Sequence, residues 1–116
     1  MTKRGAASAF DAALAERIRQ ALAGRDGVTE KKLFGCQCFL LHGHVCVGVW
    51  KQGLLVRLDR DDYEDAFKER FVQPFDITGK AMKGWAVVEP PGVAADAQLH
   101  AWIQRAAVFV ATLPAK

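Results

Sequence analysis

The sequence has few cysteines, no long apolar run and no dense run of basic residues. Its 116 residues include three cysteines, an odd number that is too low for the disulfide framework of a small secreted protein. No apolar stretch approaches the ~18 residues of a membrane-spanning helix. Asp11, Glu16 and Arg17 interrupt the N-terminal segment where a signal peptide would be hydrophobic. We therefore expect a cytoplasmic protein with reduced thiols and no membrane association.

The charge of the chain is nearly balanced. Lys and Arg number 16 and Asp and Glu number 13, which leaves a net charge of +3. The basic residues are dispersed, apart from Lys31 with Lys32 and Lys80 with Lys83, so we expect no strong autonomous binding to nucleic acid. Acidic residues gather between positions 59 and 69, and we interpret them as the solvated face of a helix.

The chain also lacks the short motifs that mark common enzymes. It contains no G-x-S-x-G, H-E-x-x-H or G-x-G-x-x-G sequence, and "TGK" at Thr78–Lys80 lacks the upstream glycine of a phosphate-binding loop. We therefore predict that the protein is not an enzyme, and we assign it no catalytic residue, no cofactor and no metal ligand.

The pattern of apolar residues predicts three helices. The segment from Ser8 to Gly24 repeats apolar residues every four positions, and Ser8 can cap its first turn. The segment "DRDDYEDAFKERF" predicts a second helix, which Asp59 can cap. A third is expected from Asp96 to Leu113. The residues expected to face the core are Phe10, Leu14, Ile18, Leu22, Tyr63, Ala66, Phe67, Phe71, Leu99, Trp102, Ile103, Ala106 and Val110.

Five strands are expected between these helices. The segments "KKLFGCQCFLL", "VCVGVW" and "LLVRL" predict three antiparallel strands between Lys31 and Leu58. After a break at Gln73-Pro74, two short strands are expected near 75–77 and 84–89. The order α-β-β-β-α-β-β-α, rich in hairpins, predicts an α+β fold of two layers, in which helices cover one face of a single antiparallel sheet. We expect one domain over residues 1–116, with residues 1–7 flexible.

All three cysteines and two of the three histidines lie in "FGCQCFLLHGHVCVG", from Phe34 to Gly48. The spacings Cys36-x-Cys38 and His42-x-His44 are each one residue shorter than the usual zinc-ligand spacing. Residues two apart on a strand share a face, so Cys36 and Cys38 should lie side by side.

The turn of this hairpin decides where Cys46 lies. A two-residue turn at His42-Gly43 would pair Leu41 with His44 and Phe39 with Cys46, which places Cys46 on the face opposite Cys36 and Cys38. A three-residue turn would bring Cys46 to the same face as the other two thiols. We favour the two-residue turn and buried cysteines that act as small apolar residues.

Three segments together resemble the TfoX N-terminal domain family, also called Sxy-like. They are "GVTEKKLFG" at Gly27–Gly35, "TGKAMKGWAVVEP" and "LHAWIQRAAVFVATLP", and the resemblance extends from about Phe10 to Pro114. Leu33, Phe34 and Gly35 look like the family's Met-Phe-Gly-Gly segment, with Cys36 in place of the second glycine. The chain is identified as a stand-alone, single-domain member.

The resemblance implies a two-layer α/β domain with an antiparallel sheet, similar to secretion-chaperone folds. The best-known members regulate genes for DNA-uptake competence together with the cyclic-AMP receptor protein, and they carry a second, helical domain. The family has no established catalytic residues that carry over to this chain. The resemblance therefore implies a regulator that works through another protein.

We interpret the chain as a protein-binding module and transcriptional co-regulator, as a monomer or a homodimer. A sheet covered by helices on one face leaves its edges and its second face to partners. The candidate contact residues are Phe34, Gly35, Gly84 and Trp85. Two alternatives stay open: a thiol or metal site formed by Cys36, Cys38, Cys46 and His44, and direct nucleic-acid binding through Lys31, Lys32, Lys80 and Lys83.

Overall fold

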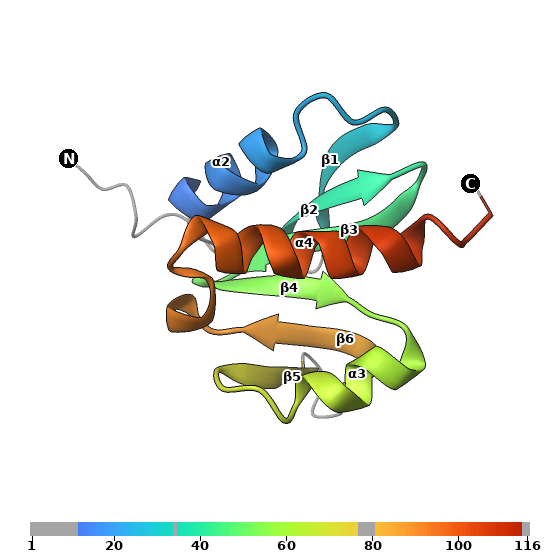
Figure 1. Cartoon of the computed structure of the whole chain (residues 1–116). Helices are drawn as coiled ribbons and strands as arrows, with labels where there is room; N and C mark the ends of the chain where they lie inside the picture. Colours follow the sequence, from blue (N-terminus) through green and yellow to red (C-terminus); the bar gives the residue numbers. More distant parts are fainter. Residues whose placement is uncertain (1–11, 34, 77–80, 115–116) are drawn as a thin grey trace.

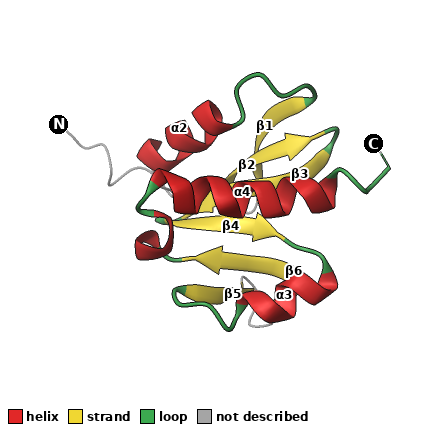
Figure 2. Cartoon of the chain, viewed as in Figure 1, coloured by secondary structure: helices red, strands yellow, loops and turns green. Residues whose placement is uncertain are grey.

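The structure of the chain is a computed structural model that describes residues 12–33, 35–76 and 81–114. The predicted flexible segment 1–7, the predicted cap Ser8 and the predicted core residue Phe10 lie outside these residues. Figures 1 and 2 show one sheet with helices packed across it. The elements are α2 (Ala12–Ala21), β1 (Val28–Leu33), β2 (Cys36–Leu41), β3 (His44–Trp50), β4 (Gly53–Arg57), α3 (Arg60–Ala66), β5 (Val72–Asp76), β6 (Ala81–Val88), a short 3-10 helix η1 (Pro90–Val93) and α4 (Asp96–Val110).

The described strands form a single antiparallel sheet in the order β1-β2-β3-β4-β6-β5. Helix α4 lies across β3 and β4, and α2 lies beside it on the same face (Figure 1). Because all buried helix residues belong to one apolar cluster with that face of the sheet, helices and sheet form two layers. The predicted α+β fold, with helices on one face of an antiparallel sheet, is confirmed.

The first of the three strands predicted between Lys31 and Leu58 is two strands in the structure. Leu33 pairs with Cys36 across a turn that contains Gly35 at φ +77°, a backbone angle that glycine adopts without steric cost. The predicted order therefore gains one strand. One strand was expected because Gly35 is the only residue in "KKLFGCQCFLL" that is typical of a turn.

Helix α3 and strand β5 differ from their predicted bounds. The helix ends at Ala66 instead of Phe71, and Phe71 turns the chain with a φ of +69°. Pro74, which was expected to break this helix or to follow its end closely, lies inside β5, after the helix has ended. A proline is compatible with this strand because β5 is at the edge of the sheet, where a missing N–H costs no ladder hydrogen bond.

The main core lies between the helices and the sheet. Helix α4 buries the stripe that the sequence predicted, because residues three and four apart point to one side of a helix. Its buried predicted residues are Leu99, Trp102, Ile103, Ala106 and Val110. From α2, Leu14 and Ile18 are buried as predicted, and so is Leu22 just beyond its end.

The second face of the sheet is buried at its centre, and half-buried apolar residues such as Trp50 and Trp85 lie around that centre. Trp50 on β3 meets Phe75 on β5 with ring centroids 5.4 Å apart, although these strands are three places apart in the sheet order. On a flat sheet, the axes of two strands three places apart would lie about 14 Å from each other. The sheet therefore bends toward this face. The buried residues there are Cys36, Cys38, Leu40, Leu55, Phe75 and Val87.

Small residues on the inner side of the bend leave room for it. Gly48 on β3 pairs with Cys38 on β2, and a Cβ atom at Gly48 would lie 3.0 Å from the Gln37 carbonyl oxygen and 3.3 Å from the Cys38 Cα. Both neighbours are backbone atoms, which cannot swing away as a flexible side chain can. Glycine at 48 and cysteine at 38 thus allow the strands and side chains to approach closely.

Candidate functional site

The turn between β2 and β3 has the predicted length. Leu41 pairs with His44, so the turn consists of His42 and Gly43. Both turn residues have positive φ, +51° and +87°, as a type I′ hairpin turn requires. The His42 N–H also donates a 2.9 Å hydrogen bond to the Gly27 carbonyl, which ties the turn to the start of β1.

The hairpin register differs from the prediction further from the turn. Phe39 pairs with Val47 instead of Cys46, because the register shifts at a β-bulge. Cys46 nevertheless packs in the cluster that faces the helices, whereas Cys36 and Cys38 pack on the other face. The prediction that Cys46 lies opposite the other two thiols is confirmed.

The three cysteines are reduced, and their side chains are buried. Burial raises the pKa of Cys46 to about 12. A hydrogen bond to Cys38, together with burial, raises the pKa of Cys36. No group of three His, Cys, Asp or Glu side chains with the geometry of a metal site occurs in the described part of the chain. The structure therefore brings Cys36 and Cys38 together on one face of the sheet and leaves Cys46 on the other.

The described lysines of the nucleic-acid alternative do not lie in one row on the sheet. Lys31 and Lys32 lie on β1, at one edge of the sheet. Lys83 lies on β6, four places away in the sheet order, and Lys80 lies outside the described residues. The lysine pair on β1 and the lysine on β6 are therefore on different parts of the sheet.

Two of the predicted contact residues, Gly84 and Trp85, line an open groove of about 530 Å³ beside α3. Gly35 lies in the exposed turn between β1 and β2 and does not line it, and Phe34 lies outside the described residues. We call this hollow the Trp85 groove. It is lined by Arg57, Leu58, Arg60, Tyr63, Glu64, Lys83, Gly84, Trp85 and Phe109.

A local kink in β6 shapes the Trp85 groove. Gly84 has a φ of +87°, and its carbonyl accepts a 2.8 Å hydrogen bond from the Leu58 N–H. A Cβ at this position would lie 3.4 Å from the Leu58 carbonyl oxygen, so glycine is needed chiefly for the backbone angle. The next residue, Trp85, then pairs with Arg57 across the strands β6 and β4.

Arg57 lies against two aromatic rings in this groove. Its guanidinium carbon is 5.3 Å from the Trp85 ring centroid and 5.8 Å from that of Phe109, within the range of cation–π attraction. Arg57, Trp85 and Phe109 are all half-buried. The groove therefore presents a cation whose side chain is held in place by packing.

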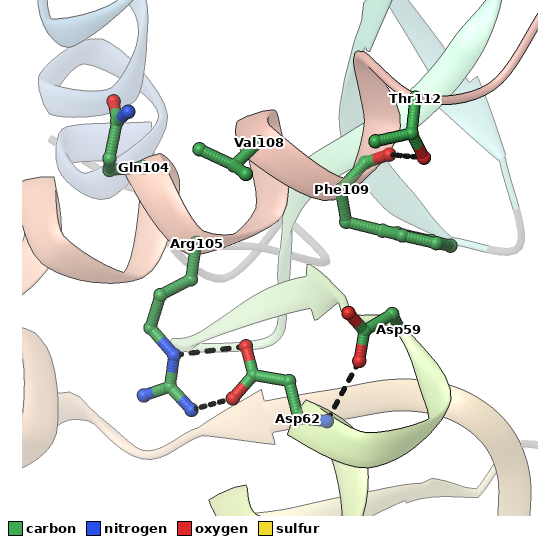
Figure 3. Close-up of a pocket in the computed structure, with 7 residues that line it drawn as sticks. All are labelled: Asp59, Asp62, Gln104, Arg105, Val108, Phe109 and Thr112. Carbon is green, nitrogen blue, oxygen red and sulfur yellow. Dashed lines mark hydrogen bonds and ion pairs between the residues drawn. The ribbon is translucent and has the colours of Figure 1, made fainter.

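A second hollow of about 490 Å³ lies between α3 and α4, and Figure 3 shows its lining. Phe109 borders both hollows, so they are neighbours. Arg105 reaches from α4 to Asp62 on α3 and donates from Nη2 to Oδ1 at 2.6 Å and from Nε to Oδ2 at 3.2 Å. Asp59 caps α3 as predicted, with Oδ1 accepting a 2.8 Å bond from the Asp62 N–H.

The acidic segment of α3 is partly an ion-pair network rather than a solvated face. Arg105 also donates to Glu69 at 2.8 Å, and its guanidinium carbon lies 4.1 Å from the centroid of the Trp102 ring. The hydrogen bond to Asp62, then that to Glu69, raises the pKa of Arg105. The network attaches α3 to α4 and so fixes one wall of each hollow.

Sequence analysis missed several residues of these hollows. Arg57 ends the apolar strand "LLVRL", and a charge at that place was a usable signal. Val108 is an apolar residue off the buried stripe of α4 and is 57% exposed, which was a second signal. Tyr63 was assigned to the core, and the structure leaves it half-buried at the groove.

Among the described helices, none combines the length and the apolar composition of a membrane-spanning segment.

Comparisons with known proteins indicate the family to which the chain belongs. Searches of the curated proteins and of the solved structures found no significant match. The model of the TfoX N-terminal domain matches residues 20–110, which is most of the 116-residue chain and includes both hollows up to Phe109. The chain therefore belongs to the TfoX N-terminal domain family.

Proposed function

We propose that this domain is a non-enzymatic protein-binding module, that it acts as a transcriptional co-regulator, and that the Trp85 groove is its contact surface. The family supports a competence-related regulator domain, and the groove supports contact with a protein. The contact residues Gly84 and Trp85 are retained from the sequence, and Arg57, Tyr63 and Phe109 are added to them.

The observation that carries the proposal is Arg57 held against Trp85 and Phe109 in an open groove. Arginine and aromatic residues are enriched in the buried centres of protein interfaces and dominate their binding energy. A side chain already fixed by packing loses little conformational freedom on binding, so more of its contact energy contributes to affinity.

We also propose that the protein is not an enzyme and that it is located in the cytoplasm. The three cysteines are buried, and the pKa of Cys46 is raised to about 12, so that thiol is protonated and unreactive at neutral pH. An odd number of free thiols suits a reducing compartment, and we place the protein in the cytoplasm.

The test is affinity capture from the native cell with mass spectrometry, using two matched variants. Glu64 and Asp61 are both exposed acidic residues of α3, but only Glu64 lines the Trp85 groove. Glu64→Trp should block the groove without removing core packing, and Asp61→Trp is its control. We expect the wild type and Asp61→Trp to capture the same partner, which is a transcription regulator, and Glu64→Trp to lose it.

Equal capture by all three proteins would show that the groove is not the contact surface. Turnover of a substrate by the purified protein would contradict the non-enzymatic part of the proposal.

A further inference from the structure

We propose that the Trp85 groove recognises an acidic segment of its partner, with carboxylates bound by Arg57, Arg60 and Lys83. The inference rests on the proposed function and names the chemistry of the partner. Three observations support it: the excess of positive charge in the groove, the packing of Arg57 against two aromatic rings, and the exposed acidic residues of α3.

The groove carries positive charge that no described carboxylate neutralises. Its charged lining residues are Arg57, Arg60 and Lys83 against the single acid Glu64. None of these three cations forms an ion pair with a carboxylate of the described residues. Elsewhere in the described structure, cations in ion pairs with a carboxylate include Arg17, Arg19, Lys68 and Arg105. An acidic ligand would complement the groove, and a basic one would be repelled.

Arg57 is suited to a carboxylate in particular. A guanidinium offers a planar fork of N–H donors that matches the two oxygens of a carboxylate. The rings of Trp85 and Phe109 lie 5.3 and 5.8 Å from its central carbon, and this packing restricts its side chain before any ligand binds. A half-buried position also reduces the screening of its charge by water.

The size of the groove fits side chains of a short segment. A volume of about 530 Å³ lies within the ~300–1,000 Å³ typical of ligand sites. The half-buried rings of Tyr63 and Trp85 offer apolar surface to an apolar residue of the same segment. We therefore expect a peptide with several Asp or Glu residues and one apolar anchor.

The acids of α3 favour a peptide over a nucleic acid. Asp61, Glu64 and Asp65 are exposed along the helix that borders the groove. Duplex DNA carries one negative charge per ~1.7 Å of its axis, so a phosphate backbone leaving the groove along α3 would meet these carboxylates. A peptide can carry its charges only where the groove is basic.

The experiment is selection of a displayed random-peptide library on the full chain. Two charge-reversed variants serve as probes of the site. Arg60→Glu with Lys83→Glu changes two exposed groove residues, and Lys31→Glu with Lys51→Glu changes two exposed residues away from it. Lys31 lies on the edge strand β1, and Lys51 lies in the turn at the other end of β4 from Arg57.

We expect the selected peptides to be enriched in Asp and Glu relative to the starting library. The groove variant should bind them about tenfold more weakly, which is about 1.4 kcal/mol. The control variant should bind them within about twofold of the wild type, and added salt should weaken binding to the wild type.

Three results would overturn the inference. They are selected peptides without an acidic excess, no selected peptide at all, and equal binding by the two charge-reversed variants. Binding of a DNA oligonucleotide that the groove variant alone loses would assign the groove to nucleic acid instead. In each case, capture of a protein partner that Glu64→Trp loses would still uphold the proposed function, because that test does not depend on the partner's charge.

Discussion

Cys46 illustrates how single residues determine the character of this domain. Its side chain is 0% exposed, and the sheet and helices surround it. A thiolate at that place would lose its hydration, so the pKa is raised to about 12. Cys36 and Cys38 are nearly as buried on the other face, and Gly48 beside Cys38 leaves room for the strands to approach. At this scale, Cys46 contributes a compact buried side chain whose thiol keeps its proton at neutral pH.

The raised pKa of Cys46 predicts a dependence of stability on pH. In the unfolded chain the thiol titrates near pH ~8.5, whereas in the folded chain it keeps its proton up to about pH 12. The stabilisation is therefore fully present below pH ~8.5 and is lost as pH rises toward 12, at up to about 1.4 kcal/mol per pH unit. Urea unfolding of the wild type and of Cys46→Ala, carried out under reducing conditions at a series of pH values, would measure this loss of stability.

The wild type should lose stability relative to Cys46→Ala above pH ~8.5 and not below it. Comparison with this variant removes the contribution of the other titrating groups. If the free energies of unfolding of the two proteins run parallel from neutral to alkaline pH, the thiol is not buried as described.

Among the elements, α4 organises the molecule. One side of it packs on β3 and β4, and Arg105 on it holds α3 through Asp62 and Glu69. Its C-terminal part, with Val108 and Phe109, borders the hollow shown in Figure 3. The same helix therefore supports the core and shapes the candidate site.

Trp102 should be the main anchor of α4. Its side chain is 6% exposed, and Trp102→Ala would remove a large apolar side chain from the core. We expect the free energy of unfolding to fall by about 3–5 kcal/mol, measured by chemical denaturation. His100→Ala on the exposed side of the same helix is the control and should change it by less than about 0.5 kcal/mol. A loss below about 1 kcal/mol for Trp102→Ala would contradict the burial of this side chain.

The pair between Arg105 and Asp62 should stabilise the contact of α3 with α4. It has two hydrogen bonds, and its side chains are 29% and 31% exposed. A double-mutant cycle with Arg105→Ala and Asp62→Ala should give a coupling energy of about 1 kcal/mol that falls with added salt.

The exposed pair of Lys68 and Asp65, at 80% and 68% exposure, is the matched control. It should give a coupling energy near zero. Equal coupling energies in the two pairs would mean that neither the partial burial of Arg105 nor its two hydrogen bonds to Asp62 strengthen the ion pair.

The elements show which features a sequence pattern can predict. Helix stripes such as that of α4 are visible because helical spacing repeats over many residues. The split at Gly35 and the bulge before Cys46 each depend on one residue, and a single residue leaves little trace in a periodic pattern. Pro74 was predicted to mark the end of a helix, and its place inside an edge strand depends on the order of the strands, which a local pattern does not contain.

At the scale of the whole molecule, the bend of the sheet and the layer of helices leave the Trp85 groove as the candidate surface. Gly84 and Trp85 could be chosen from the sequence, but Arg57 and Phe109 come from β4 and α4, far away along the chain. Their meeting follows from packing, so no spacing in the sequence predicts it. The groove also concentrates a positive charge that the net charge of +3 does not reveal.

The dispersed charge predicts weak binding to DNA. At physiological salt we expect the chain alone to bind duplex DNA no more tightly than ~10⁻⁴–10⁻⁶ M, without preference for sequence. Gel shifts against promoter DNA, with and without a candidate regulator, would measure this. Tight and selective binding by the chain alone would make it a DNA-binding protein and not a co-regulator.

The central claim is that a protein partner contacts the Trp85 groove in the cell. Photo-crosslinking tests it most directly, with p-azidophenylalanine in place of Tyr63, which lines the groove and has a similar ring. The control carries the same group in place of Gln52, an exposed residue of the turn between β3 and β4 at the other end of β4 from Arg57. We predict a discrete protein adduct from position 63 and none from position 52. An adduct to nucleic acid at position 63, or the same protein adduct from both positions, would contradict the claim.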